Sequence, residues 1–194
     1  IPILGIHIGE LGFLNQANLS DYEGIIDSIL NENIIDYVKH SLLNASICYN
    51  NKEIELLYSL NDFAINQKTY SRLLKMDVEI NGDFLNMYNC DGLIVCTPLG
   101  STAYSLSAGG PIMDPALDAI VIVPMFPHTL TSRPLVVPGS KSVSLHLGTV
   151  AENPRVSADS QVEFKLQPED EIQIRKHPYA LNLAYPTGHS FFES

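Results

Sequence analysis

The middle and the end of the chain are patterned as short β-strands. Apolar and polar residues alternate over 47–58, around Asn50-Asn51, and over 78–88, around Asn81-Gly82. An Asn-Gly pair between two alternating segments is a strong signal for a two-residue β-hairpin. Further strand-like segments lie at 119–123, 135–137, 143–147, 162–166, 172–174 and 181–185. Many short strands with turn residues between them predict an antiparallel sandwich or barrel-like domain.

The first 40 residues follow a different pattern. Residues 1–8 form an apolar run, which is typical of a parallel strand buried on both faces. Ser20-Asp21-Tyr22-Glu23 fits a capping box, and apolar residues at 25, 26, 29 and 30 then form a helical stripe. This pattern predicts the last strand and helix of an α/β domain over 1–40, followed by an all-β domain over 41–184. Residues 185–194 leave the strand pattern, and we expect them to return onto the N-terminal domain.

One stretch, from Asp91 to Pro111, combines a turn, a strand and a small polar loop. Asp91-Gly92 is a turn signal, and residues 93–96 are a short apolar run that predicts a buried strand. Ser101 or Thr102 is placed to cap a helix of about two turns, which Gly109 would end. A helix start suits an anionic or carbonyl-rich ligand. A simple strand–loop–helix connector explains the same residues.

Composition narrows the classes of function. The 194 residues include 22 Asp and Glu against 11 Lys and Arg, which argues against a surface that follows nucleic-acid phosphates. Hydrophobic residues make up 45%, enough for a sizeable core. No apolar run reaches transmembrane length and no signal peptide is visible, so we expect a cytoplasmic protein with no membrane or nucleic-acid partner. The three cysteines lack the spacing of a metal site or a disulfide framework.

The residues from Asp91 to Pro111 also resemble a family signature. Asp-Gly-Leu-Ile-x-x-Thr-Pro-x-Gly-Ser-Thr-Ala-Tyr-x-Leu-Ser-Ala-Gly-Gly-Pro is similar to the motif of the bacterial NAD kinases, and a match of this length is specific. Further segments that resemble the family lie at 1–14, 60–62, 124–138, 157–161 and 188–193. The resemblance therefore covers nearly the whole chain.

The resemblance implies a fold, an activity and partners. It implies the antiparallel, sandwich-like C-terminal domain of an NAD kinase, joined to the end of a Rossmann-like α/β domain. Enzymes of this family are kinases that transfer the γ-phosphate of ATP to the 2′-hydroxyl of the adenosine ribose of NAD and so make NADP. They use Mg²⁺ or another divalent cation. They assemble as homodimers or homotetramers in which the β domains build shared sites.

The resemblance also assigns candidate binding residues. Those expected to contact NAD are Asn61, Asp62, Asp91, Thr102, Ala103, Tyr104, Ser105, Leu106 and Ser107. Further candidates for nucleotide binding are Phe13, Arg72, Asn89 and Gln161. Carboxylates and amides suit ribose diols and exocyclic amines, and an aromatic ring can lie against a ribose or a base. Each has an ordinary structural explanation as well: a turn for the Asn-Asp pair, core packing for the aromatic residues, and a solvated face for the arginine and the glutamine.

The catalytic residue is expected outside these residues. The family's Gly-Gly-Asp-Gly motif, whose Asp is the expected general base, does not occur in the sequence and belongs upstream of residue 1. We therefore expect this chain alone to be inactive. Leu99, Asn89 and Asp62 depart from the residues common at their places in the family. A lipid kinase of the same superfamily is one alternative, although such kinases lack the Thr-Pro-x-Gly-Ser-Thr-Ala-Tyr stretch. A non-catalytic dinucleotide-binding or oligomerisation module is another.

Overall fold

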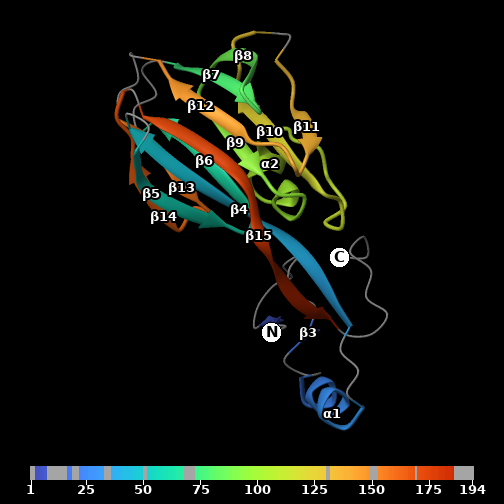
Figure 1. Ribbon diagram of the computed structural model, residues 1–194. Helices are drawn as coiled ribbons and strands as arrows, with labels where there is room; N and C mark the ends of the chain where they lie inside the picture. The colour runs from blue at the N-terminus through green and yellow to red at the C-terminus, as the bar shows by residue number, and fades with distance from the viewer. Residues whose placement is uncertain are drawn as a thin grey trace. The chain divides into compact units, whose positions relative to one another are not determined.

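The structure is a computed structural model whose described residues form two compact units. It describes residues 3–7, 17–18, 22–32, 36–49, 52–67, 73–129, 132–148, 153–168 and 170–185. One unit draws on Ile1–His40 and Ala180–Ser194, and the other on Ser41–Tyr179. Figure 1 shows both along the chain. Gly9 to Leu14, the first two residues of the capping box, and residues 186–194 lie outside the described residues.

The smaller unit contains short parallel strands. β1 (Ile3–Leu4) pairs in parallel with β15 (Glu171–Tyr185), and β2 (Ile6–His7) pairs in parallel with β3 (Ala17–Asn18). The prediction of parallel pairing is confirmed. The prediction of one strand buried on both faces is wrong, because the segment divides into two strands and Ile3 is 51% exposed.

The predicted helix is present as α1 (Tyr22–Glu32). Two residues of its apolar stripe are exposed, Ile26 at 40% and Leu30 at 73%, while Ile25 is half-buried. The helix therefore forms where the periodicity predicts it. Within the described ranges, neither this helix nor any other is long and apolar enough to cross a membrane.

The larger unit is a sandwich of two sheets, which confirms the predicted fold class. One sheet has the order β5-β4-β15-β12-β7-β8, and the other has the order β11-β10-β9-β6-β13-β14 (Figure 1). The first sheet contains β4 (Asp36–Tyr49), β5 (Lys52–Ser59), β7 (Leu74–Ile80), β8 (Asp83–Cys90) and β12 (Val143–Leu147). The second contains β6 (Asp62–Gln67), β9 (Gly92–Cys96), β10 (Ala119–Met125), β11 (Leu135–Pro138), β13 (Pro154–Ala158) and β14 (Val162–Lys165).

Both predicted hairpins form. β4 pairs with β5 and β7 with β8, in each case antiparallel. Asn81 and Gly82 have φ angles of 52° and 84°. Positive φ at both central positions is the geometry of a type I′ turn, which matches the twist of the flanking strands. The segments 172–174 and 181–185 belong to one long strand, β15, instead of two, and β6 and β13 are strands that the sequence pattern did not indicate.

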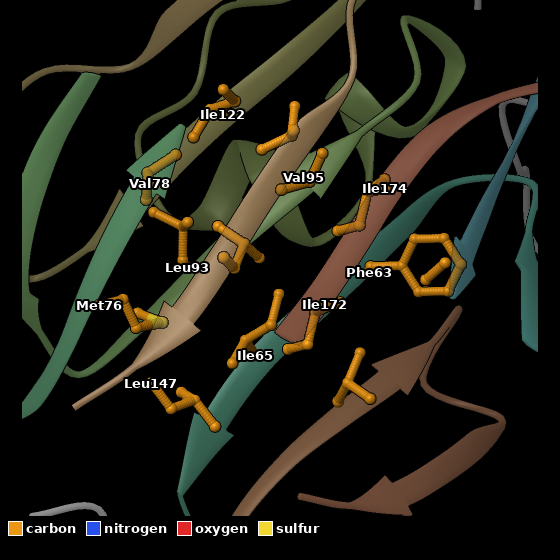
Figure 2. Close-up of a cluster of buried hydrophobic side chains, with 14 of the residues drawn as sticks. Phe63, Ile65, Met76, Val78, Leu93, Val95, Ile122, Leu147, Ile172 and Ile174 are labelled. Atoms are coloured by element: carbon orange, nitrogen blue, oxygen red, sulfur yellow. The ribbon is translucent and has the colours of Figure 1, made fainter. Parts of the chain in front are cut away.

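The main core fills the space between the two sheets. Figure 2 shows Phe63 and Ile65 of β6 and Leu93 and Val95 of β9 among the side chains that gather there. These strands also bury their other face, where Ala64, Ile94, Cys96, Val121, Val123 and Met125 form a second cluster with Ala108 and Met113. Burial on both faces explains why 93–96 and 120–123 are continuous apolar runs.

Candidate functional site

The polar loop after β9 is built from two short helical turns. η1 (Leu99–Thr102) is a 3₁₀ turn and α2 (Tyr104–Ser107) is a single α-helical turn beside β9 (Figure 1). The predicted two-turn helix with a Ser101 or Thr102 cap is therefore wrong, since neither turn has a side-chain cap. Gly109, with φ 82°, follows the end of α2 as predicted.

The loop hydroxyls bond to the loop itself instead of capping a helix. Ser101 Oγ donates to the Pro98 carbonyl at 2.5 Å and accepts the Met113 N–H at 3.0 Å. Thr102 Oγ1 donates to the Leu99 carbonyl at 3.1 Å. These bonds fix the loop conformation, so that the residues which follow are presented from a defined backbone.

The loop is locked to the Asn61-Asp62 element. The Thr97 N–H donates to the Asn61 carbonyl at 2.9 Å, and Thr97 Oγ1 donates to the Leu60 carbonyl at 2.8 Å. The same hydroxyl accepts the Gly100 N–H at 3.0 Å. Gly100 lies so close to Asn61 that an added Cβ would be 2.1 Å from the Asn61 carbonyl oxygen. Only glycine fits here. The Asn61-Asp62 element and the loop after β9 are therefore packed directly against each other.

Asp159 holds the other side of this element. Its carboxylate accepts the N–H groups of Leu60, Asn61 and Asp62 at 2.8, 2.7 and 3.0 Å, and the Ser59 hydroxyl at 2.9 Å. Asp159 has φ 48°, in the turn between β13 and β14, and its own N–H donates to the Asp62 carbonyl at 3.0 Å. Sequence reasoning placed Asp159 in a hairpin but missed this role. The carboxylate positions the element through charge-assisted hydrogen bonds.

Asp62 has an unusual electrostatic position. Its side chain is 3% exposed, and its Oδ1 atom has no hydrogen-bond partner in the described structure. Burial, and then the charge of Asp159, raise the pKa of Asp62 to about 6. A buried carboxylate oxygen without a donor is costly, and a ligand hydroxyl placed there would lower that cost. Asp62 pairs across the sheet with Cys96, whose thiol pKa burial raises to about 12.

Residues 102–107, in the second half of the loop, lie partly at the surface and partly in the interior. Tyr104, Leu106 and Ser107 are exposed. Thr102 and Ala103 are half-buried. Ser105 is fully buried beneath Gly110, where an added Cβ would be 2.2 Å from Ser105 Oγ. α2 therefore presents three side chains outward and anchors itself through the fourth.

Asp91 and Asn89 lie at the other end of β9. The antiparallel pairing sets Asp62 opposite Cys96 and Asn66 opposite Gly92, so Asp91 precedes the strand and the polar loop follows it. Asp91 and the start of the polar loop at Thr97 are about 20 Å apart along the strand, since each residue rises by roughly 3.3 Å. One copy of the chain does not bring Asp91 and Asn89 together with Asp62.

The remaining candidates are placed as follows. Gln161 is exposed in the turn that begins with Asp159, at the same end as Asn61. Phe13 and Arg72 lie outside the described residues.

The carboxylates that the structure brings together here do not by themselves form a divalent-cation site. Both oxygens of Asp159 already accept N–H groups, so that of this pair only the carboxylate of Asp62 could serve as a ligand. Mg²⁺ held by one carboxylate takes its other ligands from substrate phosphates and waters. The described ranges also contain no cluster of three or more His, Cys, Asp or Glu suited to a metal ion.

The fold, with the Asn61-Asp62 element bonded to the loop after β9, defines a two-sheet β domain with a polar loop. Comparison with known proteins gives its family. The family profile of the ATP-NAD kinase C-terminal domain matches residues 60–185. An NAD kinase from Marinobacter nauticus is 45% identical over 195 residues, and one from Hahella chejuensis is 41% identical over 194. These matches cover 99% and 100% of this chain and 65% of each relative. The chain belongs to the ATP-NAD kinase family, and it spans about 65% of the length of these curated relatives.

Solved structures agree with this assignment. A yeast NADH kinase complexed with NADH matches with a TM-score of 0.88 and 27% identity, over 96% of this chain and 55% of that one. An NAD kinase from Archaeoglobus fulgidus in complex with ATP matches with a TM-score of 0.80 and 24% identity, over 96% of this chain and 69% of that one. The second likeness concerns the fold alone.

Proposed function

We propose that this chain provides the dinucleotide-binding domain of an NAD kinase, which transfers the γ-phosphate of ATP to the 2′-hydroxyl of the adenosine ribose of NAD. The observation that carries the proposal is the lock between the Asn61-Asp62 element and the 97–107 loop through Thr97, Gly100 and Asp159. Two segments far apart in the sequence thereby present amide, carboxylate and hydroxyl groups from one rigid end of the sheet. Family membership supports the same reading.

The groups suit the chemistry of a dinucleotide. The Asp62 carboxylate and the Asn61 amide would bind a ribose diol or the edge of a base, and the exposed ring of Tyr104 would lie against a ribose or a base. Further contacts would come from the Thr102 hydroxyl, the Ala103 backbone, Leu106 and Ser107. Ser105, being fully buried, would act by supporting α2 from beneath.

The reaction needs a base that these residues do not supply. In the proposed step the ribose hydroxyl gives its proton to a general base, its oxygen bonds to the γ-phosphorus, and ADP leaves with the bridging oxygen. We assign the base to the Asp of a Gly-Gly-Asp-Gly motif, which is absent from the 194 residues. Positioning of acceptor and donor supplies most of the catalysis in phosphoryl transfer. The chain alone would therefore bind NAD without phosphorylating it, and the divalent cation that accompanies ATP is not assigned to its residues.

The domain organisation and assembly are part of the proposal. We assign 1–40 to the end of an α/β domain, 41–184 to the dinucleotide-binding and oligomerisation domain, and 185–194 to a return segment, in a cytoplasmic enzyme. Asp91 lies about 20 Å from the polar loop of its own copy. It would complete the site of a second copy in a homodimer or homotetramer, together with Asn89, while Gln161 would reach a neighbouring nucleotide from the turn beside Asp159.

A complementation assay tests the shared site. Asp62→Ala and Asp91→Ala are each made in the full-length natural protein, and NADP formation from NAD and ATP is measured for each variant and for a mixture of the two. Each variant alone should lose most activity. The mixture should regain part of it, because a mixed dimer contains one site with both native residues.

Asp83→Ala, at the exposed first residue of β8, is the matched control for the loss of one carboxylate. Mixtures that are folded and oligomeric but regain nothing would exclude a site shared between copies. Full activity of either single variant would remove that residue from the proposed site.

A further inference from the structure

A second polar pocket lies in the larger unit, away from the loop after β9. It has a volume of about 440 Å³ and is lined by Asn81, residues 139–142 and residues 175–178. The lining comes from three places: the turn between β7 and β8, the turn between β11 and β12, and the middle of β15. A volume of this order is typical of small-molecule sites.

The pocket is lined by basic residues, whereas the chain as a whole is acidic. Lys141, Arg175 and Lys176 line it, three of the 11 Lys and Arg in a sequence with 22 Asp and Glu. Among the described residues that line the pocket, none is acidic. Lys176 pairs with Asp118 at 2.5 Å, whereas Lys141 and Arg175 form no ion pair within the described structure. Two cations are left without a counter-charge on one concave surface.

Hydrogen bonds hold the walls of the pocket in place. The Asn81 N–H donates to the Ser142 carbonyl at 3.0 Å, and Asn81 Oδ1 accepts the Ser142 N–H at 2.8 Å. On the other wall, the Arg175 guanidinium donates to Gln173 Oε1 at 2.6 Å. His177 Nδ1 accepts the Tyr179 N–H at 3.2 Å, which orients the His177 ring on this wall. The Asn81–Ser142 bonds fix the turn that carries Lys141, and the bond to Gln173 orients the Arg175 guanidinium.

We propose that this pocket binds a small anion that carries two linked phosphate groups, separately from the dinucleotide site. The Arg175 guanidinium and the Lys141 ammonium match phosphate oxygens, and the fork of Arg175 can bind two oxygens at once. The lining contains no Phe, Tyr or Trp, and the His177 ring already packs against the rings of Tyr58 and Tyr179. Recognition therefore falls on the phosphates, whether these are inorganic or belong to a nucleotide.

Nuclear magnetic resonance titration of this chain with inorganic pyrophosphate, and separately with ADP, tests the proposal. The amide signals of Asn81, Gly139 and Ser142 should shift in a saturable way in the millimolar range or below. The signals of Gly100 and Ala103 report any binding at the dinucleotide site. Saturation at the pocket by either probe supports the proposal, and saturation by neither overturns it. Comparison of the two probes identifies the source of the phosphates: tighter binding of pyrophosphate indicates inorganic phosphates, and tighter binding of ADP indicates a nucleotide.

Two double variants make the test specific. Lys141→Gln/Arg175→Gln should weaken binding at the pocket about tenfold or more, because each cation contributes charge-assisted hydrogen bonds. Lys52→Gln/Lys165→Gln removes the same charge from exposed positions elsewhere and should leave binding unchanged. Equal weakening by both variants, or shifts confined to residues 97–107, would overturn the proposal.

Discussion

At the scale of single residues, Asp159 and Asp62 form a pair with opposite tasks. The Asp159 carboxylate accepts the backbone N–H groups of residues 60–62, whereas Asp62 has an oxygen atom without a hydrogen-bond partner in the described structure. Their closeness contributes to the raised pKa of Asp62. Asp159 therefore stabilises the element, and the free oxygen of Asp62 is the group that we propose binds NAD.

Replacement of Asp159 should destabilise the fold. Asp159→Ala leaves three backbone N–H groups and one hydroxyl without their acceptor, and should lower the free energy of unfolding by about 2–4 kcal/mol. Asp159→Asn keeps one acceptor oxygen and tolerates positive φ, so it should cost less. Urea denaturation of both variants measures the difference. Ser160→Ala, in the same turn, is the control, and an Asp159→Ala cost no larger than that control would contradict the role of Asp159.

Asp62 should make stability fall as the pH rises. Its pKa is about 6 in the folded state against an ordinary value of 3.8, so the folded state binds its proton more tightly. The stabilisation from that proton is fully present below about pH 4 and is lost as the pH rises through 6. Asp62→Asn removes this loss and should gain about 1–3 kcal/mol relative to the natural chain between pH 4 and pH 7. Unfolding free energies of Asp62→Asn and of the natural chain at pH 4 and pH 7 test this, with Asp83→Asn as the control. A difference between variant and natural chain that is the same at both pH values would refute it.

At the scale of elements, the contact between Gly100 and Asn61 joins η1 to the start of β6. Gly100→Ala would place a Cβ 2.1 Å from a backbone oxygen, which cannot be relieved by a side-chain rotation. The variant should lose about 2 kcal/mol or more of stability and weaken NAD binding. Chemical denaturation and calorimetry measure the two effects.

Gly24→Ala is the matched control for this change. An added Cβ at Gly24 meets nothing within 4 Å, and alanine favours a helix, so α1 should be unchanged or slightly more stable. If Gly100→Ala behaves like Gly24→Ala, the two motifs are not locked through this contact.

The elements also indicate how far sequence patterns reach. Asn81-Gly82 was predictable as a turn because both residues tolerate positive φ, and the apolar runs of β9 and β10 marked two strands, which the structure buries on both faces. β6 was not predictable, because Asn61-Asp62 has the composition of a turn and only its neighbours β9 and β13 make the following residues a central strand. The bonds of Asp159 to residues about 100 positions earlier have no local signal at all.

At the scale of the whole molecule, the sandwich separates two groups of polar residues. Asn61, Asp62 and the 97–107 loop lie at one end of β9, and Asn89 and Asp91 lie at the other. About 20 Å of strand lies between the two groups. The proposal of a site shared between copies rests on this separation.

The central claim is that a dinucleotide site lies on this β-sheet unit, and calorimetric titration of the chain with NAD tests it most directly. The account predicts saturable binding by the chain itself. It also predicts binding about tenfold or more weaker in Asp62→Ala, where a buried charged contact is lost, with Asp83→Ala unaffected. A folded chain that binds no NAD, or an Asp62→Ala variant that binds as well as the natural chain, would contradict it.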